Sequence, residues 1–199
     1  WIGNYSFFRA RIDSSREAVY DLDTETRYTY GDLERRANLL ARYLKDQIGV
    51  RKGDRVAFIA RNCIEMIDAY YATGKLGAGP MVGVDRDGVA VEVARKNLAH
   101  NGIGPDRARV VAGDLLACVD ERFDLVAANI LSEVILVLLD DIRRVLSPGG
   151  VLVCSGIISE NREKVTRKMA SLGFEILEVR EKEGWVAIAG RWVASGGSR

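Results

Sequence analysis

Three polar residues stand where they could bind a small ligand. Asp85, Asp114 and Asn129 each end, or closely follow, an apolar stretch of the sequence. In open α/β sheets, ligands bind outside the carboxyl ends of the strands, where an acidic residue can accept hydrogen bonds from both hydroxyl groups of a ribose. Asp85 is the candidate for that role, although it could instead cap the following helix together with Asp87. The pattern therefore predicts either a site for a ribose-bearing cofactor or a set of turn and cap residues.

The bulk composition is that of an ordinary globular protein. Of the 199 residues, 48% are hydrophobic and 29% are charged, and the formal net charge is +1. Such a charge gives no general electrostatic reason to bind nucleic acid or an anionic membrane. No apolar run approaches the roughly 18 residues of a membrane span, and no signal segment is recognisable. We expect a cytoplasmic protein without direct nucleic-acid or membrane partners, and we interpret the start at Trp1 as the mark of a fragment.

The cysteines do not indicate a metal site. Cys63, Cys118 and Cys154 are widely spaced and form no C-x-x-C motif. This pattern predicts neither a disulfide framework nor a zinc site, so we expect no metal. We interpret all three as small, buried apolar residues in a reducing compartment.

From residue 80 onward, apolar stretches alternate with amphipathic ones. Strands are expected at residues 80–85, 108–114, 123–130 and 151–158, and helices at 89–102, 135–146 and 161–173. Two final strands, 174–181 and 185–193, are joined by a tight KEG turn. Continuous apolar strands that alternate with helices indicate a parallel sheet covered on both faces. In the middle helix, Arg143 and Arg144 are interpreted as part of a solvated face.

Upstream, the pattern predicts a hairpin (18–23 and 27–33), a helix that Asp32 caps and that ends at Gly49, a strand (55–60) and a helix (64–76). We expect the strand 55–60 to pair in parallel with strand 80–85 or 123–130, because an unpaired apolar strand would leave its backbone groups unsatisfied. The expected fold class is α/β: a Rossmann-like, mostly parallel sheet with helices on both faces and an antiparallel C-terminal edge. A small hairpin-plus-helix segment precedes it.

Several stretches carry a recognisable family pattern: KLGAGPMVGVDRD, ARKNLAHNG, FDLVAANIL, LSPGGVLVCSGI and EGWVAIAGRW. With them, residues 76–192 resemble the methyltransferases that modify ribosomal protein eleven of the large subunit. The resemblance implies an S-adenosyl-L-methionine-dependent N-methyltransferase whose substrate is a ribosomal protein. It implies that Asp85 binds the cofactor's ribose and that Asp114 lies beside the adenine amine. Asn129 would bind the cofactor's amino-acid end and act as the catalytic residue that aims the accepting amine.

The reaction so implied is in-line attack of a neutral amine on a sulfonium methyl group. It needs alignment and acceptors for the amine's protons more than a strong base. The family's glycine-rich loop lets the backbone approach the cofactor closely, but residues 61–67 read RNCIEMI, without glycine. Cys63, Glu65 and Ile67 fall near the glycine positions, and we expect their side chains to fill the pocket.

A second family pattern lies upstream, in YTYGDLERRANLLARYL and GVRKGDRVAFIARNCIEMIDAYYATGKLGA. These stretches make residues 1–78 resemble the N-terminal part of AMP-forming acyl-CoA ligases. That family's chemistry depends on a Ser/Thr/Gly-rich phosphate loop and a C-terminal lysine, and neither has a counterpart in this sequence. The two resemblances meet at residues 75–79, so the chain looks like a chimera in which residues 55–78 supply a borrowed first strand and helix.

Together these interpretations predict a ligase-like segment (1–54), a methyltransferase-like Rossmann domain (55–192) and a flexible tail (193–199). The predicted function is that of an S-adenosylmethionine-dependent ribosomal protein methyltransferase, impaired by the missing glycine loop. The alternatives are a fragment of an AMP-forming acyl-CoA ligase and a non-catalytic chimeric protein.

Overall fold

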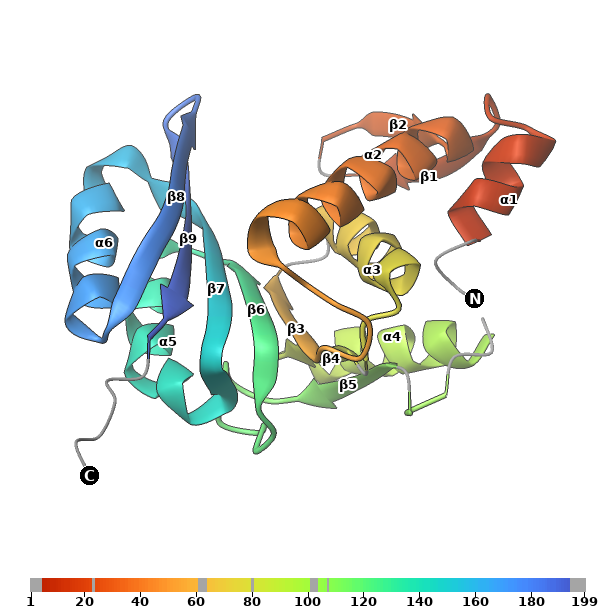
Figure 1. Ribbon diagram of the computed structural model, residues 1–199. Helices are drawn as coiled ribbons and strands as arrows, with labels where there is room; N and C mark the ends of the chain where they lie inside the picture. The colour runs from red at the N-terminus through yellow and green to blue at the C-terminus, as the bar shows by residue number, and fades with distance from the viewer. Residues whose placement is uncertain are drawn as a thin grey trace. The chain divides into compact units, whose positions relative to one another are not determined.

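The computed structural model describes residues 5–22, 24–60, 64–79, 81–100, 104–106 and 108–193 (Figure 1). The chain forms two compact units: residues 1–53 with 62–79, and residues 54–61 with 80–199. The helix at 64–76 therefore groups with the upstream residues, and the strand before it groups with the downstream ones. The domain limits expected at residues 54 and 192 divide the chain differently and stay a prediction.

The described part of the first unit is a hairpin with helices. In chain order its elements are α1 (Tyr5–Ile12), β1 (Glu17–Asp21), β2 (Thr26–Thr29), α2 (Tyr30–Tyr43), the π-helical turn η2 (Leu44–Ile48) and α3 (Ile64–Leu76). The expected hairpin is confirmed, because β1 pairs antiparallel with β2. The expected helix cap is wrong: Thr29, not Asp32, is the N-cap of α2. Asp32 instead completes a capping box by accepting a hydrogen bond from the Thr29 N–H at 3.0 Å.

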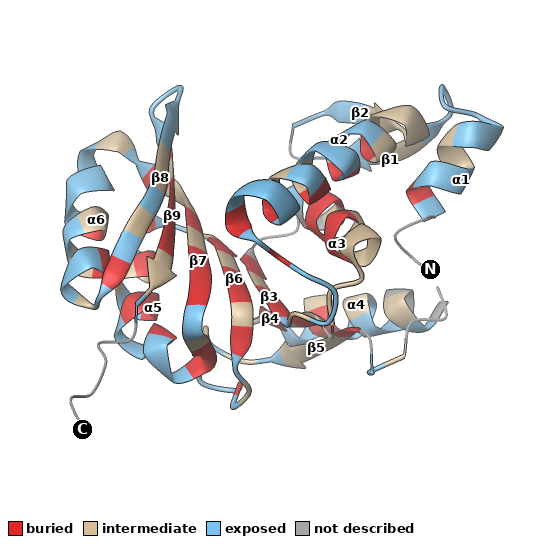
Figure 2. Ribbon diagram, viewed as in Figure 1, coloured by how far each residue is buried: buried red, intermediate tan, exposed pale blue. Residues whose placement is uncertain are grey.

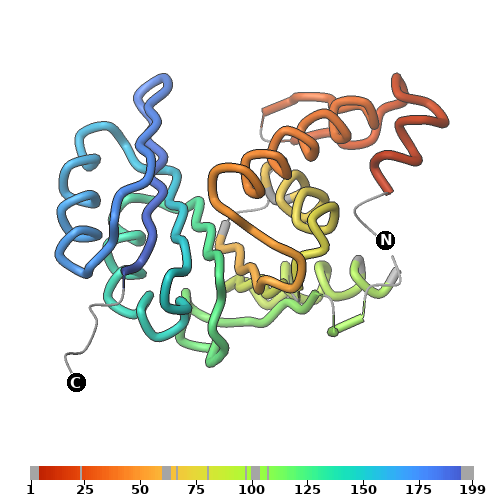
Figure 3. Tube along the Cα trace, viewed as in Figure 1, coloured from red at the N-terminus to blue at the C-terminus, as the bar shows by residue number. Residues whose placement is uncertain are grey.

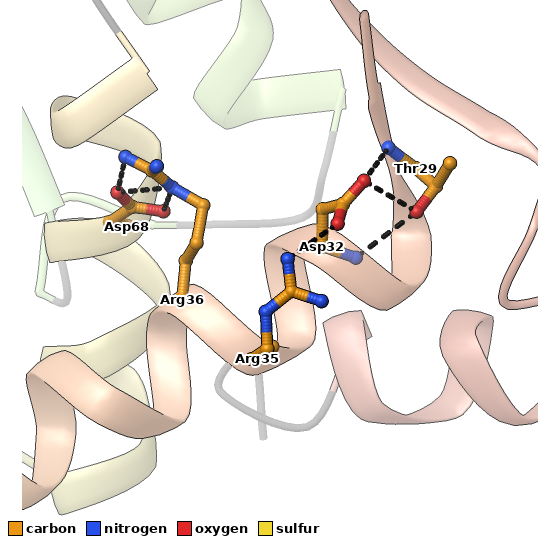
Figure 4. A network of polar contacts seen from close by, with 5 residues as sticks. All are labelled: Thr29, Asp32, Arg35, Arg36 and Asp68. Carbon is orange, nitrogen blue, oxygen red and sulfur yellow. Dashed lines mark hydrogen bonds and ion pairs between the residues drawn. The ribbon is translucent and has the colours of Figure 1, made fainter.

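Among the described residues, ion pairs connect α2 with α3. The Arg36 guanidinium donates three hydrogen bonds to the Asp68 carboxylate, at 3.0, 2.9 and 2.6 Å (Figure 4). Lys75 Nζ lies 2.9 and 2.8 Å from the two carboxylate oxygens of Glu34. These contacts join residues that are more than thirty positions apart in the chain.

The second unit is a seven-stranded sheet with helices, whose chain path can be followed in Figure 3. Its elements are β3 (Val56–Ala60), β4 (Met81–Asp85), α4 (Gly88–His100), β5 (Ala108–Ala112), β6 (Phe123–Asn129), α5 (Ser132–Val145), β7 (Leu146–Ile158), the short turn η3 (Ser159–Asn161), α6 (Arg162–Ser171), β8 (Phe174–Lys182) and β9 (Trp185–Trp192). The strand order is β5-β4-β3-β6-β7-β9-β8.

β3 is an interior strand of this sheet and pairs in parallel with both β4 and β6. The pairing expected for residues 55–60 is thereby confirmed. β4–β5 and β6–β7 are also parallel, whereas β9 is antiparallel to β7 and β8. α4 follows β4 and α5 follows β6, so these connections run outward from β3 in opposite directions. Because crossovers between parallel strands are right-handed as a rule, we infer that α4 and α5 cover opposite faces of the sheet. The α/β fold class with an antiparallel C-terminal pairing is confirmed.

The core of the second unit includes the apolar face of α5, seen as buried segments in Figure 2. Its buried residues recur at helical spacing: Ile135, Leu138, Leu139, Ile142 and Val145. Burying each such leucine or isoleucine side chain stabilises the fold by about 1.5–3 kcal/mol. α5 starts earlier than expected, at Ser132, and β7 already begins at Leu146, which pairs with Phe123 of β6. The SPGG sequence, expected only to stop the helix, therefore lies within a strand.

In the parts of the chain that the structure describes, no helix has both the length and the apolar character needed to cross a membrane.

Candidate functional site

The candidate site lies at the carboxyl edge of the second unit's sheet. The strands β3, β4, β5 and β6 are mutually parallel, so their carboxyl ends share one edge. The strand order reverses at β3, with β4 and β5 on one side and β6 and β7 on the other. Open α/β sheets bind their ligands at such a switch point. The register puts Asn129 beside Ala60 of β3, and Asp85 beside Ala112 of β5.

Asp85 is the last residue of β4, and its side chain is half-buried. Its Oδ1 accepts a hydrogen bond from the Asp87 N–H at 2.9 Å, and Asp87 Oδ1 accepts one from the Val89 N–H at 2.8 Å. Asp87 thus caps the first turn of α4, while Asp85 supports the turn before it. The alternative expectation was that both aspartates cap the helix. Asp87 does so directly, whereas Asp85 accepts its hydrogen bond from Asp87 and not from the helix.

Asp114 follows β5 and is brought to Asp85 through the backbone. The Gly113 N–H donates to the Asp85 carbonyl oxygen at 3.0 Å. In addition, Asp114 Oδ1 lies 3.7 Å from Nε of Arg86, with side chains that are 68% and 81% exposed. An ion pair this exposed contributes at most about 1 kcal/mol. The backbone contact, more than the ion pair, places the two carboxylate-bearing loops side by side.

The loop around Asp114 is tightly folded. Leu115 has a φ of 50°, a left-handed conformation that residues other than glycine rarely adopt. A Cβ on Gly113 would lie 2.2 Å from the sulfur of Cys118, so any other residue there would force Cys118 to move. Cys118 is exposed, which contradicts the expectation that it is buried; it lies in this surface loop rather than in a strand. Cys154 is buried as expected, and burial raises its thiol pKa to about 12.

Asn129 ends β6 against β7. Gly156 of β7 has a φ of 80°, and a Cβ there would lie 2.6 Å from the Ile130 carbonyl oxygen and 3.1 Å from Asn129 Oδ1. Just beyond, the buried Ser132 Oγ accepts a hydrogen bond from the Ile158 N–H at 3.2 Å. Sequence reasoning did not single out Gly156 or Ser132. A glycine inside an otherwise apolar strand is the signal that points to a close approach of this kind.

The segment expected to replace the glycine loop lies only partly in the described ranges. Residues 61–63, which include Cys63, lie outside them. Glu65 and Ile67 belong to α3 of the first unit, where Glu65 Oε1 is 3.6 Å from the Arg36 guanidinium. Their expected obstruction of a cofactor pocket stays a prediction. Across the described residues, no cluster of three or more His, Cys, Asp or Glu side chains could hold a metal ion.

The fold is that of the Rossmann-like methyltransferases. A ribosomal protein L11 methylase from Lactobacillus delbrueckii subsp. bulgaricus superimposes with a TM-score of 0.64 at 29% identity, over 80% of this chain and 78% of that one. A methyltransferase from Pyrococcus furiosus has the same fold, with a TM-score of 0.62 at 16% identity, over 94% of this chain and 96% of its own.

The family follows from the sequence match. Residues 71–192 match the model of the Ribosomal protein L11 methyltransferase (PrmA) family, and the chain belongs to that family. The Ribosomal protein L11 methyltransferase of Desulfosudis oleivorans is 44% identical over 149 residues, which cover 65% of this chain and 49% of the relative. That of Exiguobacterium sp. is 42% identical over 139 residues, covering 70% and 43%. The chain thus spans about half the length of the curated relatives it matches.

The upstream match is to a different family. Residues 8–87 match the model of the AMP-binding enzyme family, which overlaps the first match at residues 71–87. Both family resemblances inferred from the sequence are confirmed.

Proposed function

We propose that the chain is an S-adenosylmethionine-dependent protein N-methyltransferase whose substrate is a ribosomal protein, weakened by the loss of its glycine loop. Membership of the methyltransferase family supports the reaction class. The observation that carries the site is the joining of the Asp85 and Asp114 loops at the switch-point edge of the sheet, through the Gly113 N–H and the Asp85 carbonyl. The proposal implies a cytoplasmic location, together with the ribosomal substrate.

The residues at this edge fit the nucleoside half of the cofactor. Carboxylates accept hydrogen bonds from hydroxyl and amino groups, so Asp85 suits the ribose hydroxyls and Asp114 the adenine amine. When bound, the cofactor supplies a sulfonium methyl group as the electrophile. The Asn129 amide would hold the cofactor's amino-acid end and accept a hydrogen bond from the substrate amine, which keeps that amine aligned.

The methionine half of the cofactor fits less well. A glycine-rich loop normally follows the central strand because only glycine allows the backbone to approach so closely. Residues 61–67 contain no glycine. Hydrogen bonds to ribose and amide groups contribute on the order of 1 kcal/mol each, which is too little to compensate for an obstructed pocket. We therefore expect poor binding of S-adenosylmethionine by the unmodified chain.

Calorimetric titration with S-adenosylmethionine tests both halves of the proposal. One variant replaces residues 61–67 with a D-x-G-x-G-x-G sequence, and a control replaces the same residues with a glycine-free sequence of equal length. Binding should appear in the first variant only. Asp85→Ala in that variant should weaken it by roughly tenfold or more, since about 1.4 kcal/mol corresponds to a factor of ten.

Each outcome has a separate meaning. Tight binding by the unmodified chain would show that the cofactor loop is misplaced. No binding by the glycine-loop variant, if circular dichroism shows it folded, would contradict the cofactor site itself. The folding control is needed because Ile64, the first residue of α3, is buried and lies within the replaced segment.

The match to AMP-binding enzymes supports a second reading, in which the upstream residues are a ligase fragment without its active site and the whole is a non-catalytic chimera. ATP–pyrophosphate exchange tests the ligase part of this reading.

A further inference from the structure

Arg144 lies in the last turn of α5 and is exposed, as its sequence context predicted, but its guanidinium is also hydrogen-bonded to a neighbouring loop. Its guanidinium donates hydrogen bonds to the backbone carbonyl oxygens of Leu116 and Val119, through two different nitrogens. It also lies 3.6 Å from the Asp120 carboxylate. The side chain is 42% exposed, but its charged end is bound to the loop that follows β5. The sequence pattern predicted the exposure of Arg144 but not these hydrogen bonds, which form because the loop folds back over the end of the helix.

The segment that Arg144 holds is the one that carries Asp114. The Ala117 N–H donates to the Asp114 carbonyl oxygen, and the Val119 N–H to the Leu116 carbonyl oxygen, both at 3.1 Å. The segment therefore consists of two consecutive turns. Leu116 and Val119 are 2% and 1% exposed, so their side chains are fixed in the core. Arg144 binds the carbonyl groups of the same two residues and thereby fixes the backbone between them.

A guanidinium suits this contact because its planar fork can donate to two acceptors at once. Without it, two partly buried carbonyl groups would lose a charge-assisted hydrogen bond each. The strained φ of Leu115 makes the segment dependent on such restraints, because a sparsely populated backbone conformation persists only where the surroundings enforce it.

We propose that Arg144 is a positioning residue: it holds residues 113–119 in the conformation that presents Asp114 to the cofactor, and it acts on binding through Asp114. This inference rests on the proposed function. Among the described residues, the Asp114 carboxylate makes one long, exposed ion pair, with Arg86, so the backbone of its own segment determines where it lies.

Hydrogen exchange on the full chain without cofactor tests the restraint. Arg144→Gln should speed exchange of the Ala117 and Val119 amides by about tenfold or more, while the amides of β6 and β7 stay protected. Arg144→Lys should restore part of the protection, because an ammonium group can donate to one of the carbonyls. Arg143→Gln, an exposed neighbour with the same loss of charge, should change nothing. Unchanged exchange in Arg144→Gln, or a uniform increase across the sheet, would overturn the proposal.

Binding then tests the action through Asp114. In the glycine-loop variant, Arg144→Gln and Asp114→Ala should each weaken S-adenosylmethionine binding by about fivefold or more. The double variant should bind no more weakly than Asp114→Ala alone, because residues that act through one another are not additive. Additive losses would refute the positioning role. If the glycine-loop variant binds no cofactor, the proposed function fails, and the exchange result alone decides whether Arg144 holds the segment.

Discussion

The loops that carry Asp85 and Asp114 are joined through backbone atoms and not through the carboxylates of the two residues. The Gly113 N–H reaches the Asp85 carbonyl oxygen, while the Asp85 side chain is engaged with the Asp87 N–H. Replacing either carboxylate should therefore leave the two loops joined. Asp114 is the simpler target for a binding experiment, because replacing Asp85 also removes the hydrogen bond from the Asp87 N–H.

Gly156 allows β7 to pass close to the end of β6, and we expect its replacement by alanine to be unusually costly. Gly149 is a matched control: both residues have a φ of 80°, but a Cβ on Gly149 meets nothing within 4 Å. Backbone strain alone should cost about 1 kcal/mol in Gly149→Ala. Gly156→Ala should cost at least about 2 kcal/mol, because its Cβ would overlap the Ile130 carbonyl oxygen and press on Asn129. Urea unfolding of both variants measures the difference, and equal losses would show that β6 and β7 can move apart freely.

Among the elements, α5 serves two parts of the candidate site. Its first residue, Ser132, lies shortly after Asn129 and accepts a hydrogen bond from β7. Its last turn carries Arg144, which holds the Asp114 segment. Between them, the buried face of the helix ties it to the sheet. Because the helix is rigid, it can keep the end of β6 and the Asp114 segment at a fixed distance from each other.

In the first unit, we expect neighbouring arginines of α2 to differ sharply in their effect on stability. Arg36 binds Asp68, whose side chain is 9% exposed, and this hydrogen bonding raises the pKa of the guanidinium. Arg35 pairs with Asp32 on the surface and is 68% exposed (Figure 4). Arg36→Gln should cost about 2 kcal/mol, less than a fully buried pair because Arg36 is itself 32% exposed. Arg35→Gln should cost less than about 0.5 kcal/mol.

Urea unfolding followed by far-ultraviolet circular dichroism measures these two losses. Similar midpoints for the two variants would mean that the contact between α2 and α3 does not depend on the Arg36–Asp68 pair.

At the scale of the whole molecule, the chain matches the models of two families and forms two compact units. We expect the chain to catalyse no ATP–pyrophosphate exchange with any carboxylic acid. The phosphate loop and the lysine on which ligase chemistry depends have no counterpart in the sequence. An active acyl-CoA ligase assayed alongside provides the positive control. Exchange above the level of a buffer blank would show that the upstream residues retain ligase chemistry.

Much of the fold could be predicted from the sequence because strands and helices differ in the spacing of their apolar residues, which is visible within a short stretch of chain. The apolar runs that end at Asp85 and Asn129 predicted the strands, and their ends predicted where a ligand would bind. The family motifs, too, are contiguous. The sequence by itself thus determined the α/β class, the order of the main strands and helices from the hairpin onward, and the candidate residues Asp85, Asp114 and Asn129.

Only the tertiary structure decided how these pieces meet. It placed β9 between β7 and β8, joined the Asp85 and Asp114 loops, and brought Arg144 to carbonyl groups more than twenty residues away. It also revealed why Gly156 must be glycine. Apart from the glycine within an apolar strand at Gly156, these contacts have no local signature, because each depends on the packing of segments that are distant in the chain. The periodicity of a sequence indicates only which face of a single element is buried.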